Sequence, residues 1–126
     1  MKFKRLRIAV VDDEAQVRKA LERLMRGAGF EVSTYTCGAE FLASLAAKEP
    51  DCLVLDVHMP GLSGFEVQDS LRSRGSTFPV VVITGHDSAG AAGHAMAAGA
   101  SAYLRKPVDG PELIQAITRA AAAGVP

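Results

Sequence analysis

Short apolar runs alternate along the chain with segments of helical periodicity. Four continuous runs have the length of strands, at residues 8–11, 52–55, 80–83 and 102–104. A fifth segment, Glu31–Tyr35, alternates polar and apolar residues, as expected of a strand that is covered less completely. We therefore expect three strands in the middle of a sheet, with Glu31–Tyr35 and the short 102–104 run at its edges.

Helical patterns separate these runs. The clearest covers residues 14–28, where apolar positions fall on one face and Gly29 closes the helix. A second covers residues 39–47. Pairs of capping type, three residues apart, predict helix starts, and they are Asp13 with Gln16, Ser63 with Glu66, and Asp109 with Glu112. The segment 87–99 is rich in glycine and alanine, so we expect a marginal, mobile helix there.

Strict alternation of strand and helix predicts a parallel sheet with helices on both faces. Central apolar strands with less covered edge strands agree with the 2-1-3-4-5 order of the flavodoxin-like, doubly wound (βα)5 fold. The 126 residues suffice for one domain, with a core at about residues 6–122 and a short flexible tail. That tail is compatible with a native end or with the stump of a linker.

Composition narrows the function. Fourteen lysines and arginines balance 14 aspartates and glutamates, so no net charge favours binding to nucleic acid or to an anionic membrane. The basic start is followed by an apolar run too short for a signal peptide or a membrane span. Cys37 and Cys52 are too few for a disulfide framework, and both are expected to behave as small apolar residues. We expect a soluble cytoplasmic protein.

The residues that carry chemistry follow the predicted strands. Ligands of such sheets bind beyond the carboxyl ends of the strands, and there the sequence places Asp12, Asp13, Asp56, Thr84 and Lys106. Each has an ordinary explanation when taken singly, as a cap, a turn former or a solvated side chain. Crowded carboxylates repel one another unless a cation compensates, and their oxygen ligands suit Mg²⁺. Aspartate is also an established phosphoryl acceptor.

Five motifs follow one another along the chain: VVDDE at 10–14, LVLDVHMPGLSG at 53–64, VITGH at 82–86, AGA at 98–100 and YLRKP at 103–107. With these motifs in this order, the chain resembles the receiver domains of two-component response regulators, and FixJ-type receivers most. The resemblance implies a phosphoacceptor signalling module of a phosphorelay rather than a turnover enzyme, with slow intrinsic phosphotransfer and autodephosphorylation.

The resemblance also implies a role for each matching residue. Asp56 accepts the phosphoryl group, Lys106 pairs with its oxygens, and Thr84 moves towards it while Tyr103 turns inward as the switch. Mg²⁺, with Mn²⁺ as a substitute, is held by Asp13 and Asp56 directly, by Asp12 through water and by the backbone carbonyl of His58. The donor is a sensor histidine kinase, a histidine phosphotransfer protein or a small phosphodonor. The output is a downstream protein target or a fused effector domain, with a homodimer on phosphorylation as a further possibility.

His58 and His86 follow Asp56 and Thr84 by two positions. The two imidazoles either tune loss of the phosphoryl group, contact the kinase or are simply exposed loop residues. A transition-metal site built from them is the less favoured alternative, because the surroundings are rich in oxygen.

Three other classes fit less well. An aspartyl-phosphate phosphatase usually carries an acid/base Asp where this chain has His58. A flavin-binding electron carrier needs glycines and hydroxyls where this chain has acidic residues after the first strand. A pseudo-receiver normally lacks one of the acidic or lysine positions, all of which are present here.

Overall fold

The computed structural model of the chain describes residues 5–59, 61–86 and 88–123. The first four residues of the basic start, Pro60, Asp87 and the last three residues of the tail lie outside the described residues.

Five parallel strands and five helices alternate along the chain. The strands are β1 (Arg7–Val11), β2 (Glu31–Tyr35), β3 (Cys52–Asp56), β4 (Val80–Thr84) and β5 (Ala102–Arg105). The helices are α1 (Ala15–Gly27), α2 (Gly38–Ser44), α3 (Gly64–Ser73), α4 (Ala91–Ala97) and α5 (Gly110–Ala123). The sheet order is β2-β1-β3-β4-β5, so the predicted fold and the predicted edge strands are confirmed.

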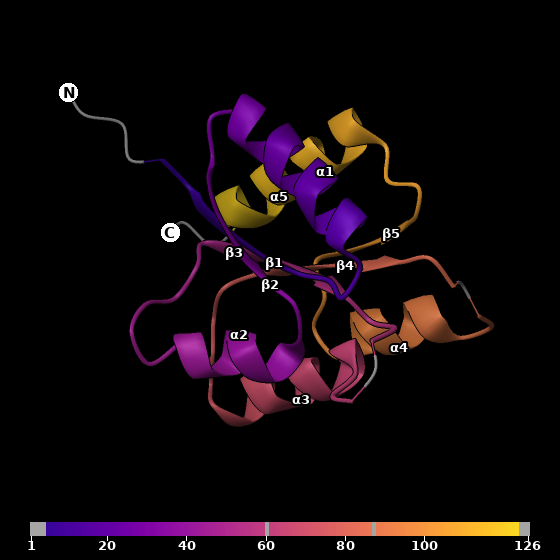
Figure 1. The fold of residues 1–126 in the computed structure, drawn as a ribbon. Helices are drawn as coiled ribbons and strands as arrows, with labels where there is room; N and C mark the ends of the chain where they lie inside the picture. The colour runs from indigo at the N-terminus through magenta and orange to yellow at the C-terminus, as the bar shows by residue number, and fades with distance from the viewer. Residues whose placement is uncertain (1–4, 60, 87, 124–126) are drawn as a thin grey trace.

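The helices cover both faces of the sheet. Figure 1 shows α1 and α5 on one face and α2, α3 and α4 on the other. Alternate strand residues therefore enter two cores: Val11 and Leu55 pack with Phe41 of α2, while Val10 and Val54 pack with Met25 of α1. Every residue of β3 and β4 is buried, which explains why these strands read as continuous apolar runs.

The predicted caps of two helices are confirmed. Ser63 and Glu66 form a reciprocal capping box at the start of α3. At the start of α5, the Asp109 carboxylate accepts a hydrogen bond from the backbone N–H of Glu112 at 2.9 Å. These two helices therefore begin where the sequence predicted, since both caps are made by residues close together in the chain.

Two local predictions are wrong. The Asp13–Gln16 cap does not form, because α1 begins after Glu14, which makes no side-chain cap. Instead the carboxylate of Asp12 accepts from the backbone N–H of Glu14 at 2.9 Å, so a turn centred on Asp13 connects strand to helix. Helix α2 ends at Ser44 instead of residue 47, and the chain continues through a tighter turn in which the Ala47 N–H donates to the Ser44 carbonyl.

Helix α4 has little apolar packing. Its buried residues, Ala91 and Ala95, are both alanines, and its large apolar residue Met96 is 47% exposed. The predicted weak packing of this helix is confirmed, whereas its mobility stays a prediction. Within the described residues, no helix is both long and apolar enough to span a membrane.

Candidate functional site

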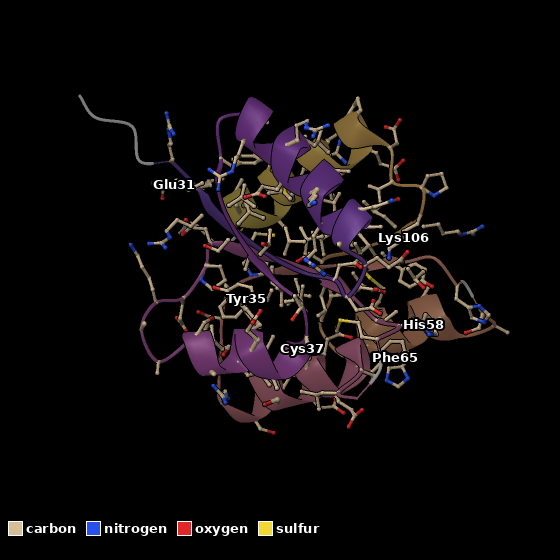
Figure 2. All side chains as sticks on the ribbon, viewed as in Figure 1. Glu31, Tyr35, Cys37, His58, Phe65 and Lys106 are labelled. Atoms are coloured by element: carbon tan, nitrogen blue, oxygen red, sulfur yellow. The ribbon has the colours of Figure 1, made fainter. Side chains whose placement is uncertain are left out.

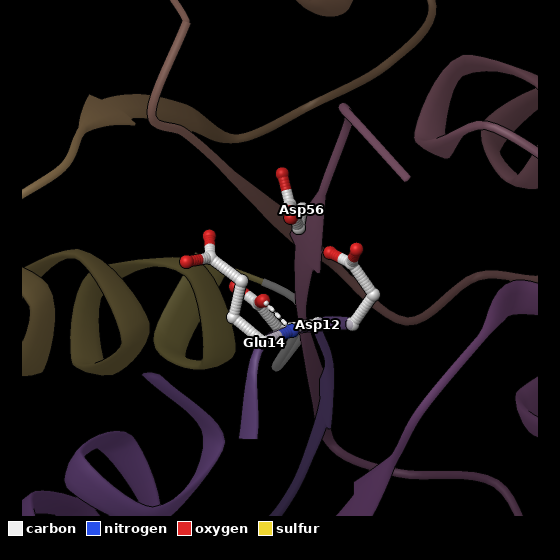
Figure 3. A group of neighbouring side chains, drawn as sticks. Asp12, Glu14 and Asp56 are labelled. Carbon is white, nitrogen blue, oxygen red and sulfur yellow. Dashed lines mark hydrogen bonds between the residues drawn. The ribbon is translucent and has the colours of Figure 1, made fainter. Parts of the chain in front are cut away.

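The predicted site residues meet at the carboxyl edge of the sheet. Val11 pairs with Leu55 and Asp56 pairs with Ile83, so the ends of β1, β3 and β4 lie level with one another. This register brings Asp12 beside Asp56, and Figure 3 shows both carboxylates together with that of Glu14. In Figure 2, His58 and Lys106 lie at the right-hand side of the molecule, away from Glu31 at the start of β2.

Four carboxylates gather at this edge. One ligand oxygen from each of Asp12, Asp13, Glu14 and Asp56 lies within 4.8 Å of the others. Asp12 and Asp56 are buried, with exposed fractions of 0% and 1%, while Asp13 and Glu14 are exposed. The cluster thus has two buried carboxylates and two that face solvent, so a cation can enter it from solvent.

Lys106 links three of these carboxylates. Its ammonium nitrogen lies 2.9 Å from Asp12 Oδ2, 3.1 Å from Glu14 Oε1 and 3.3 Å from Asp56 Oδ2. Burial alone would lower the pKa of Lys106, but the surrounding carboxylates raise it, so the side chain stays charged. The peptide bond that follows Lys106 is cis.

Asp56 has a perturbed acidity. Burial raises the pKa of its carboxyl to about 6, and the neighbouring Asp12 charge acts in the same direction. The backbone N–H of His58, which donates to Asp56 Oδ1 at 3.0 Å, and the Lys106 ammonium both act in the opposite direction. A bound cation would favour the ionised form further, because it replaces the solvation that burial removes.

The Thr84 hydroxyl is engaged in its own turn. It accepts from the backbone N–H of His86 at 3.0 Å and donates to the His86 carbonyl, also at 3.0 Å. Thr84 is 1% exposed and ends β4 beside Asp56 on β3. The predicted hydroxyl therefore stands at the site, bonded to the loop that leads to α4.

Tyr103 lies one strand further along the sheet. It pairs with Val82 across β4 and β5 and packs, half-buried, against the core that also holds Phe41. This position on an edge strand leaves its ring at the border between core and solvent. Its predicted inward turn remains a prediction.

The two histidines are exposed, and their rings touch. The ring centroids of His58 and His86 are 5.1 Å apart with an interplanar angle of 73°. The sequence placed the two imidazoles at the same edge, two positions after Asp56 and Thr84, but their direct contact depends on how two separate loops fold against each other. Sequence reasoning also missed Glu14 as a partner of Lys106, although its place directly after two aspartates was a signal.

Comparison with known proteins identifies the family. Residues 8–118 match the response regulator receiver domain. This chain belongs to that family. Receiver domains are the phosphoacceptor modules of two-component systems, which is the function that the motifs predicted.

Several regulators are similar to this receiver domain. The DNA-binding transcriptional regulator NtrC of Escherichia coli is 40% identical over 88% of the chain, which spans 24% of NtrC. The transcriptional regulatory protein FixJ of Azorhizobium caulinodans is 38% identical over 89% of the chain, which spans 53% of FixJ. The response regulator MprA of Mycobacterium avium is 43% identical over 86%, and the chain spans 48% of MprA. The chain thus spans about a quarter to a half of these relatives.

Solved structures agree with the fold. The crystal structure of FixJ-N superposes with a TM-score of 0.89 at 35% identity and covers 98% of this chain and 99% of its own. The response regulator StyR gives 0.85 at 38% identity, covering 96% of this chain and 61% of its own. The strand order and the FixJ-type resemblance are both consistent with these two likenesses.

Proposed function

We propose that Asp56 is the phosphoacceptor of this receiver domain. The observation that carries the proposal is the placement of a buried carboxylate at the end of a central strand, between an ammonium and three further carboxylates. In the transfer, an oxygen of Asp56 forms the new bond to phosphorus, while the bond to the donor nitrogen of a phosphohistidine breaks. The leaving imidazole takes the electron pair of that bond.

The acidic cluster suits Mg²⁺, or Mn²⁺ in its place. Its donors are carboxylate oxygens, and the buried Asp12 Oδ2, whose one close partner is the Lys106 ammonium at 2.9 Å, keeps a lone pair that can accept from a metal-bound water. Asp13 and Asp56 would hold the ion directly, Asp12 through water, and the His58 carbonyl would complete the protein ligands. The ion would neutralise charge on the transferring group and orient it.

Lys106 and Thr84 would bind the negatively charged phosphoryl group on Asp56. The Lys106 ammonium already contacts Asp56, so it can follow the phosphoryl oxygens with little movement. To reach the phosphoryl group, the Thr84 hydroxyl has to give up both hydrogen bonds to His86. That release changes the β4–α4 loop, and Tyr103 moves into the space that Thr84 leaves.

The two histidines would tune how long the phosphoryl group persists. Both rings are exposed, and the backbone N–H of His58 already bonds Asp56. At this position they can restrict or assist the water that hydrolyses the acyl phosphate slowly.

The chain would work as one domain over residues 1–126 with a core at about 6–122. The phosphoryl donor would be a sensor histidine kinase or a histidine phosphotransfer protein. The phosphorylated domain would then act on a target protein, on a fused effector domain or on a second copy of the chain. The cytoplasm suits its two free cysteines, Cys37 and Cys52, which stay reduced there.

Acetyl phosphate tests the proposal directly. The protein is incubated with it, with and without Mg²⁺, and the intact mass is recorded for the wild type, for Asp56→Asn and for Asp69→Asn, an exposed control on α3. We expect one added phosphoryl group in the wild type and in the control, only with Mg²⁺. Phosphorylation of the Asp56→Asn variant, or its absence from the wild type, would refute the assignment.

A further inference from the structure

The imidazoles of His58 and His86 form a cluster that the phosphoacceptor chemistry does not use as metal ligands. They come from two loops, β3–α3 and β4–α4, and both are exposed. Within the described residues, neither ring forms a hydrogen bond or an ion pair, so their nitrogens are available to a ligand. The third histidine, His94, stacks on Phe65 at a centroid distance of 4.1 Å.

The spacing of the two rings, which is also that of an ordinary edge-to-face contact, leaves room for one metal ion to bridge them. A metal–nitrogen bond of about 2.0–2.1 Å, with about 1.1 Å more to the ring centre, puts each centroid about 3.2 Å from the ion. At a tetrahedral angle, two such rings have centroids about 5 Å apart. The observed separation is 5.1 Å, and the planes are steeply inclined at 73°.

We propose that His58 and His86 form a two-imidazole site for a divalent transition metal ion such as Zn²⁺, Ni²⁺ or Cu²⁺, with water at the remaining positions. The site differs in ligand chemistry from the acidic cluster, because imidazole nitrogen selects these ions whereas carboxylates suit Mg²⁺. The oxygen-rich surroundings argued against such a site, but those oxygens belong to Asp12, Asp13, Glu14 and Asp56, a group that includes no imidazole nitrogen.

An ion at this site would oppose the movement of Thr84 that accompanies phosphorylation, and this part of the inference rests on the proposed function. Both backbone groups of His86 are bonded to the Thr84 hydroxyl, and the backbone N–H of His58 is bonded to Asp56. An ion between the rings ties the two loops together in the arrangement that keeps Thr84 turned to His86. Because coupling is reciprocal, phosphorylation of Asp56 should weaken metal binding as much as the metal opposes phosphorylation.

Binding is tested with Ni²⁺ alone. Ni²⁺ is titrated calorimetrically into the full chain without an affinity tag, in excess Mg²⁺ so that the acidic cluster is occupied. The proteins are the wild type, His58→Gln, His86→Gln, the matched control His94→Gln, and Asp13→Asn. We expect one site in the wild type, at least about tenfold weaker binding in each of the first two variants, and unchanged binding in the other two.

A second readout does not depend on variants that fold well. Paramagnetic Cu²⁺ should broaden the ring signals of His58 and His86 in the wild-type NMR spectrum before those of His94. Equal broadening of all three rings, or Ni²⁺ affinity that falls with Asp13→Asn and not with His86→Gln, would overturn the proposed site.

The coupling is tested on the rate of phosphorylation by acetyl phosphate in Mg²⁺, with and without saturating Ni²⁺. We expect Ni²⁺ to slow the wild type by about fivefold or more and to leave the rate of the His58→Gln, His86→Gln double variant unchanged. Equal slowing in both proteins would place the effect in the acidic cluster and overturn the coupling. A chain that binds Ni²⁺ through both histidines but never gains a phosphoryl group would refute the proposed function and leave the metal site standing.

Discussion

Asp56 is surrounded by groups that act on its charge in opposite directions. Burial raises its pKa to about 6, while the His58 N–H and the Lys106 ammonium hold it below the value that burial alone would give. The folded protein therefore binds a proton at Asp56 more tightly than the unfolded chain does. The ionised form that the proposed phosphoryl transfer needs is consequently a source of instability in the absence of a metal ion.

This instability has a defined pH window. Between about pH 4 and pH 6 the folded state holds more protons at this site than the unfolded state, so the stability contributed by Asp56 falls as pH rises. We expect Asp56→Asn to raise the free energy of unfolding at pH 7 in EDTA by up to about 3 kcal/mol. Urea denaturation of both proteins at pH 7 and at pH 4 checks this, because the stability gained by Asp56→Asn should vanish at pH 4. An equal gain in stability at both pH values would contradict the raised pKa of Asp56.

Lys106 stabilises the most deeply buried charge of the site. Asp12 is fully buried, and its Oδ2 atom has the Lys106 ammonium 2.9 Å away. In Lys106→Met this carboxylate loses its counter-charge, so we expect a loss of about 3 kcal/mol or more in EDTA, partly restored by Mg²⁺. Denaturation of Lys19→Met, which removes an exposed lysine on α1, provides the control. Equal midpoints for the two variants would show that the buried ion pair contributes little.

The start of α3 lies very close to the end of β3. A Cβ atom on Gly64 would stand 2.4 Å from Val57 Cα and 2.5 Å from the Asp56 carbonyl oxygen. Both are backbone atoms, so the overlap could be relieved only by moving the main chain. A side chain at position 64 would therefore push the helix away from the strand that carries Asp56. The glycine thus allows the close approach of helix and strand at the site.

Two glycine-to-alanine changes should have opposite signs. Gly64→Ala is expected to destabilise the domain by about 3 kcal/mol or more through this overlap. Gly93→Ala lies in α4, where a Cβ meets nothing within 4 Å, so it should stabilise by about 1 kcal/mol. Thermal unfolding of the pair measures both. Destabilisation by Gly93→Ala would mean that α4 packs more tightly than its alanines indicate.

Helix α4 receives two directional contacts from α3. Gln68, which is 2% exposed, donates its side-chain N–H to the Ala95 carbonyl at 3.1 Å, and Phe65 stacks on His94. Because it buries only small residues, its amides should exchange hydrogen faster than those at the centre of α1. Hydrogen exchange measured by NMR tests this, and Gly93→Ala should slow the exchange of α4 alone. Equal protection of α4 and α1 would contradict the expectation of a marginal helix.

Elements could be predicted where neighbouring residues decide them. The Ser63 and Asp109 caps and the alternating strand β2 depend on side chains a few positions apart, and the sequence predicted all three. The Asp13 cap failed because α1 begins one residue later, after a turn in which the Asp12 carboxylate accepts from the Glu14 N–H, and periodicity does not reveal this start. The Thr84–His86 turn is local, but nothing in its sequence distinguishes it from other turns. The contact of the two imidazoles depends on two loops that the sheet brings together, so their equal spacing from Asp56 and Thr84 indicates a shared edge but no ring contact.

At the scale of the whole molecule, the sheet collects charge that the chain does not carry overall. Lysines and arginines balance aspartates and glutamates, yet four carboxylates converge at one end of the strands, where Lys106 contacts three of them. Folding therefore creates an acidic cluster, the proposed cation site, that the unfolded chain lacks. An ion bound only by the folded state stabilises it by mass action.

Mg²⁺ should accordingly raise the unfolding temperature of the wild type in proportion to the logarithm of its concentration. A concentration 100-fold above the dissociation constant corresponds to about 2.7 kcal/mol. We expect Asp13→Asn to lose most of this shift and the exposed control Asp69→Asn to keep it, as measured by calorimetry in EDTA and in Mg²⁺. An equal shift in both variants would place the ion elsewhere.

The burial of Cys52 gives the two thiols of this domain different accessibilities. Its side chain is 0% exposed in the central strand β3, and burial, with Asp51 nearby, raises the pKa of the thiol to about 12, whereas Cys37 lies half-buried at the start of α2. A maleimide dye should therefore attach first to Cys37, and a second adduct requires the sheet to open. The rate of double labelling would then report how often the folded domain opens around its centre, before and after phosphorylation, with no engineered residue.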